Sequence, residues 1–429
     1  MTFADITYYT FKGYIKLIHD TLLLRHRYVE GMEHLPKPGE RFIIACNHQN
    51  TGNDPLNIVF ALPFERRTCA LARANLFEIK PWITSFLKWV GMVPAFRMDW
   101  EGAEGLRGND ASFAQVAERI NDGFPLMIFP QAGHTQGHYL GRFTTGTVRI
   151  AMNAAQQNGW QEDVKILPTA LVYSDFFDVQ TDVMWRLAPA ISMKPYYEEY
   201  QQHPAKAMRL ITHQMHDTIQ QMMLDEGEED YAERDFLRLS SLNVEHRERY
   251  TLPQLLERDQ AFIDRLTAHP QYHEIIAKAK DLRQALQEVG VPEPILAEGP
   301  SAARCTLQGI GLLLLLPLWV ACLWPHLLCY LIPFPLLKTD RMFTNTYRYV
   351  LSTLVIYPLT AIATILVLGL CLGLWWQGVI WALLLIPTGK FAWWYYCLLR
   401  RWAARMRMLL QGKAMAEARK MREEIDNFL

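Results

Sequence analysis

A histidine and an aspartate lie six residues apart in the polar segment Asn-His-Gln-Asn-Thr-Gly-Asn-Asp, residues 47–54. The segment follows the apolar run at residues 42–46 and precedes Pro55. An imidazole held by a carboxylate is a suitable general base, because imidazole titrates close to neutral pH. His48 and Asp54 are therefore candidates for a base and its orienting carboxylate. The structural alternative is a polar turn in which Asp54 is the N-cap of a helix that starts at Pro55.

The elements that would position this pair are read from the apolar pattern. Strand-like runs occupy residues 42–46, 68–72, 92–96, 125–129 and 166–173, and helix-like segments occupy 55–62, 112–120 and 146–157. Strands and helices in alternation predict an α/β fold with a largely parallel sheet flanked by helices. We assign this domain to residues 28–195. The His–Asp segment would then leave the carboxyl edge of a buried strand, where α/β proteins bind their ligands.

Helical patterns flank this domain on both sides. Residues 1–27 form an expected N-terminal helix whose apolar residues recur at helical spacing among Lys and His, which fits either a membrane-surface helix or a helix packed on the core. The first residues lack the apolar core and cleavage site of a signal peptide. Residues 196–300 read as a polar helical insert or linker, and the acidic run at 225–235 reads as a solvated loop.

Residues 301–400 have the composition of a membrane region. Residues 307–337 contain no Asp, Glu, Lys or Arg, and further apolar segments cover 349–374 and 379–399, against the roughly 20 residues that a crossing needs. Several prolines interrupt the first segment. Basic segments prefer the cytoplasm. We therefore interpret 307–337 as a re-entrant hairpin and the other two segments as transmembrane helices, with the α/β domain and a basic tail helix at 401–429 in the cytoplasm; three full crossings are the alternative.

Charge and cysteine content exclude some classes of protein. The net charge of −1 gives no electrostatic reason to expect nucleic acid as a partner. The seven cysteines include no Cys-x-x-Cys pair, so neither a zinc site nor a disulfide framework is predicted. We expect no metal site and no cofactor.

Three further blocks follow the His–Asp segment in a characteristic order. They are Gly-Met-Val-Pro-Ala-Phe-Arg at 91–97, Phe-Pro-Gln-Ala-Gly-His at 129–134 and Ile-Leu-Pro-Thr-Ala-Leu at 166–171. Over residues 28–175 the chain resembles the glycerolipid acyltransferases, the PlsC-like family of glycerol-3-phosphate and 1-acylglycerol-3-phosphate acyltransferases. The resemblance implies a membrane-bound enzyme of phospholipid biosynthesis. It would move a fatty acyl chain from acyl-CoA or acyl-carrier protein to a hydroxyl of glycerol-3-phosphate or a lysophospholipid.

The resemblance also implies roles for individual residues. His48 would be the general base that takes the proton of the acceptor hydroxyl, and Asp54 would orient its imidazole. Arg97, and with weaker support Arg73, would bind the phosphate of the acceptor through charge-assisted hydrogen bonds. The other substrate-binding candidates lie in the third block, shortly after it, or beside the histidine: Gln131, Ala132, Gly133, His134, Arg142 and Asn50.

Two departures from the family pattern bear on these roles. Five residues separate His48 from Asp54 where the family usually has four, which places Asn53 at the common position and leaves it as the alternative partner. In the third block, Gln131 replaces a glutamate and His134 replaces an arginine. The acceptor would then be either a phosphate-bearing molecule held by fewer partners or a non-phosphate lysolipid with an amine or amino-acid head group. A catalytically degenerate lipid-binding relative is a third reading.

Overall fold

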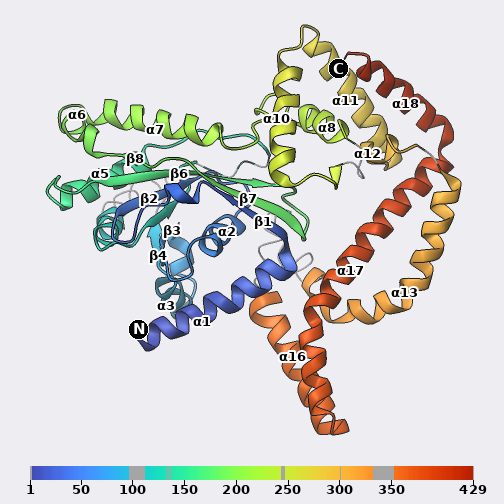
Figure 1. Ribbon diagram of the computed structural model, residues 1–429, viewed down its shortest axis with the longest axis horizontal. Coiled ribbons are helices and arrows are strands. Elements are labelled where there is room, and N and C mark those ends of the chain that lie inside the picture. The colour runs from blue at the N-terminus through green and yellow to red at the C-terminus, as the bar shows by residue number, and fades with distance from the viewer. Residues whose placement is uncertain are drawn as a thin grey trace. The chain divides into compact units, whose positions relative to one another are not determined.

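The computed structural model describes residues 2–95, 112–131, 133, 135, 137–242, 247–299, 301–331 and 352–428. The chain forms two compact units, which we call the sheet unit and the helical unit. The sheet unit comprises Met1–Lys16, Arg27–Phe176 and Val183–Asp225, and the helical unit comprises Leu17–His26, Phe177–Asp182 and Glu226–Leu429. Figure 1 shows that the sheet unit contains a twisted sheet with helices, whereas the helical unit consists almost entirely of helices.

A mostly parallel sheet forms the centre of the sheet unit. Its order is β1-β7-β6-β2-β5-β3-β4, with β8 paired to β6. The strands are β1 (Leu24–Glu30), β2 (Arg41–Cys46), β3 (Cys69–Arg73), β4 (Met92–Ala95), β5 (Leu126–Ile128), β6 (Val164–Tyr173), β7 (Thr181–Leu187) and β8 (Ile191–Ser192). β2 pairs in parallel with both β5 and β6, and β3 pairs in parallel with β4 and β5. β7 and β8 pair with β6 in antiparallel fashion. The predicted α/β fold is confirmed.

The interior of the sheet explains why its central strand is so apolar. Every residue from Phe42 to Cys46 in β2 is fully buried. A strand covered on both faces needs an unbroken apolar run, whereas a half-exposed strand would alternate. The run Phe-Ile-Ile-Ala-Cys satisfies that need and delivers the next residues to the carboxyl edge of the sheet.

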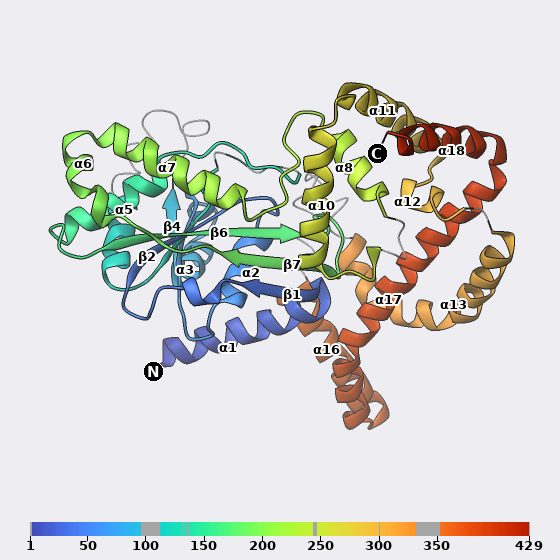
Figure 2. The same ribbon diagram turned by 45° about the horizontal axis from the view of Figure 1, so that its top comes forward.

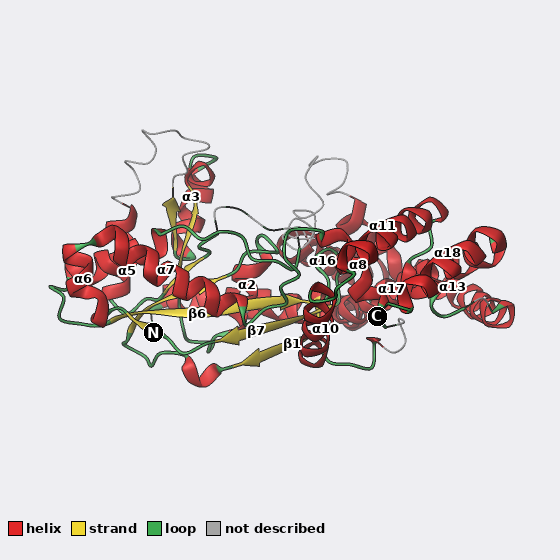
Figure 3. Ribbon diagram, turned by 90° about the horizontal axis from the view of Figure 1, so that it is seen from above, coloured by secondary structure: helices red, strands yellow, loops and turns green. Residues whose placement is uncertain are grey.

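Helices cover the sheet, and those predicted at residues 55–62, 112–120 and 146–157 are among them. They are α2 (Asn53–Ala61), α3 (Pro81–Trp89), a helix over residues 112–121, α5 (Gly146–Gln157), α6 (Tyr197–Gln202) and α7 (Pro204–Gln220). In α5, Val148, Ile150 and Ala151 are fully buried. α5, α6 and α7 lie together at one end of the unit (Figures 2 and 3). Strands β1, β7 and β8 had no counterpart in the sequence prediction.

The N-terminal helix α1 (Phe3–Ile18) packs on the sheet unit instead of extending to residue 27. A π-helical turn follows it, and β1 begins at Leu24. The amine of Lys12 donates to the backbone oxygen of Phe64 at 2.9 Å, and that of Lys16 to Phe60 O at 2.7 Å. Burial lowers the pKa of Lys12 to about 8. These lysines donate hydrogen bonds to carbonyl groups at and beyond the C-terminal end of α2, because the last turn of a helix leaves its acceptors unsatisfied.

The helical unit contains the apolar C-terminal segments. Its helices are α8 (Tyr231–Ser240), α10 (Leu252–Thr267), α11 (Tyr272–Val289), α12 (Glu293–Leu296), α13 (Ala302–Leu331), α16 (Tyr357–Leu366), α17 (Trp375–Leu410) and α18 (Gly412–Asp426). Two stretches, Ala302–Leu323 and Leu354–Cys371, are long and apolar enough to cross a membrane. Little of either stretch is buried inside the protein, at 11% and 17%.

The structure differs from the predicted hairpin at residues 307–337. Residues 302–331 form one continuous helix, α13, that contains Pro317 and Pro325. The last residues of the predicted hairpin, 332–337, lie outside the described residues. Proline removes one backbone donor and bends a helix. In an apolar environment the remaining backbone groups still need internal partners, which favours a bent helix over a turn within this stretch.

The acidic run at 225–235 is also not the solvated loop that its charge predicted. Glu226 is fully buried, and Glu233, in the first turn of α8, is only 9% exposed. Arg238 bonds the Glu226 carboxylate at 2.5 Å and the Asp259 carboxylate at 2.8 Å. Buried charges need such partners. Part of the run thus lies in the helical core, where Glu226 and Asp259 of α10 both pair with Arg238 of α8.

Gly31 allows a close backbone approach that another residue would prevent. Its φ is +76°, and a Cβ at this position would lie 2.1 Å from the backbone oxygen of Leu187. Gly39 has a similar φ of +91°, but no described atom lies within 4 Å of its Cβ position. We expect Gly39→Ala to reduce the free energy of unfolding by about 1–2 kcal/mol through backbone strain alone. Gly31→Ala should lose roughly 1–3 kcal/mol more through overpacking.

Urea unfolding of the two glycine variants, followed by circular dichroism, measures the difference between them. Equal losses at Gly31 and Gly39 would contradict the close approach to Leu187.

Candidate active site

The candidate site begins where β2 ends. Residues 47–52 connect Cys46 at the carboxyl end of β2 to α2, which begins at Asn53. Thr51 adopts a φ of +44°, in the left-handed region that non-glycine residues rarely occupy. Such strain persists only where surrounding contacts enforce it, and it is common at functional sites. The connection is therefore a tightly constrained turn and not a flexible loop.

Asp54 organises this turn. Its carboxylate is fully buried. Oδ2 accepts hydrogen bonds from His48 Nδ1 at 2.7 Å, from the backbone N–H of Gln49 at 2.9 Å and from that of Asn50 at 2.8 Å. Oδ1 accepts the hydroxyl proton of Tyr173 at 2.6 Å. Four donors compensate the desolvation of the charge, which a buried carboxylate requires.

Asp54 is not the N-cap that the turn reading predicted. α2 begins two residues earlier than predicted, at Asn53 instead of Pro55, with Gly52 at the N-cap position. Asp54 therefore lies in the first turn of the helix, where the helix dipole stabilises a negative charge. Its side chain reaches back to residues that precede the helix. This geometry lets the pair meet across the loop-to-helix junction in spite of the extra residue between them.

The imidazole of His48 is held on several sides. Its side chain is 18% exposed. The ring stacks on Phe129 with a centroid distance of 4.2 Å. Its backbone N–H donates to Gln131 Oε1 at 2.5 Å, and its carbonyl accepts from the N–H of Thr135 at 3.2 Å. Because an ionised carboxylate only accepts, Nδ1 carries the proton and Nε2 carries the lone pair. The ring thus has the tautomer that a general base needs.

Tyr173 is a site residue that the sequence prediction missed. It ends β6, is 2% exposed, and accepts a hydrogen bond from Asn57 Nδ2 at 3.1 Å while donating to Asp54. Burial, reinforced by the neighbouring Asp54 charge, raises the pKa of Tyr173 well above its ordinary value. The hydroxyl therefore stays protonated and remains a donor. We regard Tyr173 as a positioning residue, because it acts on His48 through Asp54.

Asn47, the first residue after β2, was also missed. Its Oδ1 accepts the backbone N–H of Leu171 at 2.7 Å, and its Nδ2 donates to Leu171 O at 2.9 Å. The side chain thereby continues the pairing of β2 with β6 beyond the last paired residue of β2, Cys46. This bond fixes the start of the turn relative to β6, the strand that supplies Tyr173.

Gln131, in the place of the family's glutamate, is turned inward. It is 5% exposed, and its carbonyl oxygen bonds the His48 backbone. Its Nε2 is buried with no hydrogen-bond partner among the described residues. A Cβ on Gly141 would approach that nitrogen to 2.9 Å, so Gly141 covers it closely. Gln131 therefore supports the turn at His48. Gly133 is exposed, while Ala132 and His134 lie outside the described residues.

The structure describes two of the three predicted basic residues, Arg73 and Arg142. Arg73 is the last residue of β3. β2 and β3 both run parallel to β5, so Arg73 ends at the same edge of the sheet as His48. Arg142 is exposed on the segment before α5, and Arg97 lies outside the described residues. The structure thus brings His48 together with Asp54, Asn50 and Gln131, and it places Arg73 at the same edge.

The two cysteines of the sheet unit are poor nucleophiles. Burial raises the pKa of the Cys46 thiol far above its ordinary range and that of Cys69 to about 11. Since the thiolate is the reactive form, neither is set up to form a covalent intermediate. The chemistry of the described part of the site therefore centres on the imidazole.

Replacing Tyr173 tests the support of Asp54. In Tyr173→Phe the carboxylate loses one of its four donors and the amide of Asn57 loses its acceptor. We expect the free energy of unfolding to fall by about 1.5–3 kcal/mol, as for hydrogen bonds to charged groups. Tyr196→Phe removes an exposed hydroxyl that donates to Gln214 at 3.0 Å, and it should change stability by less than about 0.5 kcal/mol.

Denaturant unfolding of both tyrosine variants supplies the comparison. A Tyr173→Phe variant as stable as Tyr196→Phe would show that the hydroxyl does not hold the carboxylate.

Comparisons with known proteins concern the part of the chain that contains this site. Residues 26–172 match the family model described as Acyltransferase. The crystal structure of the 1-acyl-sn-glycerophosphate (LPA) acyltransferase PlsC from Thermotoga maritima is 17% identical, with a TM-score of 0.31 over 48% of this chain and 79% of that chain. At that TM-score the likeness carries no weight here. No curated protein matches the chain. The family match spans the His–Asp turn, the third block and β6. Residues 26–172 therefore match the acyltransferase family, and this match identifies them as an acyltransferase domain.

Proposed function

We propose that this acyltransferase is membrane-bound and moves a fatty acyl chain from acyl-CoA or acyl-carrier protein to a hydroxyl of glycerol-3-phosphate or a lysophospholipid. The observation that carries the proposal is the 2.7 Å hydrogen bond between His48 Nδ1 and the buried carboxylate of Asp54. It leaves Nε2 as the basic nitrogen of a ring at the carboxyl edge of the sheet.

The proposed reaction is a direct transfer between two substrates. Nε2 of His48 takes the proton of the acceptor hydroxyl as its oxygen attacks the carbonyl carbon of the thioester. The tetrahedral intermediate then collapses, the carbon–sulfur bond breaks, and the imidazolium returns its proton to the leaving thiolate. Asp54 stabilises the imidazolium during this step. A positioned base supplies about 10²–10⁴-fold of rate, and holding both substrates in place supplies much of the rest.

Gln131 bears on which acceptor is used. A neutral amide that bonds the His48 backbone adds no negative charge beside the acceptor. Arg73 at the sheet edge and the exposed Arg142 supply positive charge for a phosphate, which favours glycerol-3-phosphate or a lysophospholipid. The second candidate is a non-phosphate lysolipid with an amine or amino-acid head group, which the replacement of the family's arginine by His134 favours. The intact hydrogen-bonded pair of His48 and Asp54 counts against a degenerate relative.

Exposed apolar residues on both units support the placement at a membrane. In the sheet unit, α1 packs against α3 through Phe11, whose ring centroid lies 5.8 Å from that of Phe86. Phe3 on α1 and Trp82 on α3 are 81% and 70% exposed. In the helical unit, the stretches Ala302–Leu323 and Leu354–Cys371 expose most of their apolar surface. Aromatic side chains of this kind anchor proteins at lipid interfaces.

The basic tail contributes less to the orientation than its composition suggested. Arg400 pairs with Asp178 at 3.4 Å, Arg401 with Glu248 at 2.5 Å, and Arg405 with Glu298 at 2.7 Å. Paired charges attract anionic lipid less than unpaired ones do. We retain the cytoplasmic side for the acyltransferase domain because its proposed acyl donors are cytoplasmic thioesters.

Removing the base should abolish the reaction. We expect His48→Ala to lower kcat/KM for acyl transfer by about 10²–10⁴-fold. His213→Ala is the matched control, because it removes another histidine bonded to an aspartate, Asp217 at 2.8 Å, on an exposed helix surface. Radiolabelled acyl-CoA and purified enzyme, with phosphate-bearing and amine-bearing acceptors tested in parallel, give the rates. Substantial activity in His48→Ala would refute the base role, and transfer only to amine-bearing acceptors would favour the second candidate.

The same assay shows whether Asp54 or Asn53 is the partner of His48. Asp54→Ala removes the acceptor of His48 Nδ1, whereas the side chain of Asn53 donates to Asn50 Oδ1 at 3.3 Å and not to the imidazole. We expect at least about 10²-fold loss of kcat for Asp54→Ala and less than about tenfold for Asn53→Ala. Asp54→Asn, which keeps the size and removes the charge, checks that the loss is not simple unfolding. A larger loss for Asn53→Ala would reassign the partner of His48.

A further inference from the structure

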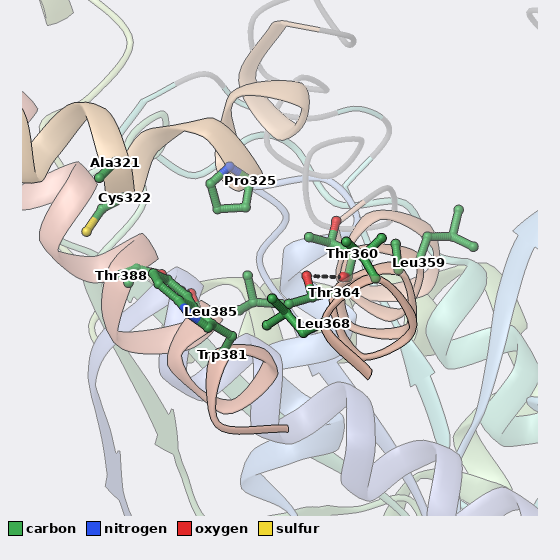
Figure 4. A pocket seen from close by; sticks show the side chains of 12 residues that line it. Ala321, Cys322, Pro325, Leu359, Thr360, Thr364, Leu368, Trp381, Leu385 and Thr388 are labelled. Carbon is green, nitrogen blue, oxygen red and sulfur yellow. Dashed lines mark hydrogen bonds between the residues drawn. The ribbon is translucent and has the colours of Figure 1, made fainter. Parts of the chain in front are cut away.

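A second candidate site, which is apolar, lies within the helical unit. Segments that the acyltransferase family match does not cover form it. α13, α16, the π-helical turn Val367–Cys371 and α17 surround a cavity of about 520 Å³. Figure 4 shows its lining side chains, with Cys322 and Pro325 from α13, Thr364 from α16 and Trp381 from α17. This volume lies within the roughly 300–1,000 Å³ of small-molecule pockets.

The walls of the cavity suit a hydrocarbon. Every described residue that lines it is uncharged, and the polar ones are threonines apart from Cys322 and the indole of Trp381. The hydroxyl of Thr364 donates to Thr360 O at 2.7 Å, and that of Thr388 donates to Leu384 O at 2.7 Å. Because their protons are committed to their own helices, these side chains present mainly methyl groups to the cavity. A ligand gains from burying apolar surface here and finds no counter-charge.

A buried histidine keeps the cavity walls in place. His326 on α13 is 1% exposed. Its Nδ1 lies 2.8 Å from the hydroxyl of Tyr357 on α16, and its Nε2 lies 3.1 Å from the hydroxyl of Thr388 on α17. One side chain thereby links the three helices that line the cavity. Hydrogen bonds between helices in an apolar environment stabilise their association, so the cavity is preformed and does not depend on its ligand.

From these observations we propose that the cavity binds one acyl chain of a membrane phospholipid. The inference rests on the membrane placement proposed above, because the helices that form the cavity include both candidate spans. In a bilayer, acyl chains are the surrounding solvent, and an apolar cavity left empty would forfeit contacts with its walls. The uncharged lining favours a chain whose head group stays at the interface over a free fatty acid whose carboxylate would enter with it.

Photo-crosslinking of the full chain tests this site. The protein is reconstituted in phosphatidylcholine nanodiscs that contain a phosphatidylcholine with a diazirine on its acyl chain. Ala363→Trp fills the cavity with a side chain from its own wall. Ala361→Trp is the matched control, because two residues turn a helix by about 200° and so place the indole on the other side of α16. Crosslinked residues are mapped by mass spectrometry.

The expected result is label concentrated on the cavity-lining peptides of α13, α16 and α17, in excess over the exposed Leu313 and Leu314 of α13. Ala363→Trp should lose this excess and Ala361→Trp should keep it. Equal labelling of cavity and exposed residues in the unaltered chain would overturn the proposal even if Ala363→Trp does not fold. Cavity labelling by a diazirine acyl-CoA but not by the phosphatidylcholine would overturn the choice of a bilayer lipid.

Flotation of the unaltered chain with phosphatidylcholine vesicles distinguishes a failure of the proposed lipid site from a failure of the proposed membrane placement. A chain that does not float contradicts the membrane placement, and with it this site. A chain that floats but shows uniform labelling contradicts the site alone. Acyl transfer measured on the same protein reports on His48 and Asp54 independently of either outcome.

Discussion

The buried carboxylate of Asp54 is the constraint on which the rest of the site depends. A charge removed from water is tolerated only when donors replace its hydration, and here four donors do so. They come from the imidazole of His48, two backbone amides of the turn and the hydroxyl of Tyr173 on β6. The shape of the turn, the start of α2 and the end of β6 must all agree for that set to form. Orientation of the imidazole is thus a consequence of satisfying one charge.

This constraint explains how the family's pattern survives an additional residue between histidine and aspartate. Asp54 meets His48 from the first turn of α2, across the junction between loop and helix, and not along one helix face. Within this longer turn Thr51 adopts a left-handed φ, and the side chain of Asn47 fixes the start of the turn to β6. Gln131 adds a bond to the His48 backbone from the third block. Its neutral amide supports the turn at His48, so other groups must recognise the acceptor.

Sequence pattern was sufficient for the elements but not for the contacts between them. The runs that became β2, β3, β4, β5 and β6 were recognisable because buried parallel strands are apolar throughout. Strands β1, β7 and β8 carry no comparable signal. Tyr173 lies 119 residues beyond Asp54, so only the pairing of β2 with β6 brings them together. Charge was misleading at Glu226, because an acidic run in sequence does not show that Arg238, three residues after the run, folds back onto its carboxylate.

The protonation state of the His48 ring tests the central claim most directly. The account requires a proton on Nδ1, donated to Asp54, and an unprotonated Nε2. Nitrogen-15 NMR of the full chain labelled at its histidines, with His48 assigned by difference from His48→Gln, reports the protonation of both ring nitrogens. The predicted spectrum has the Nδ1–H tautomer, which should be lost in Asp54→Asn. A dominant Nε2–H tautomer in the unaltered chain would contradict the account.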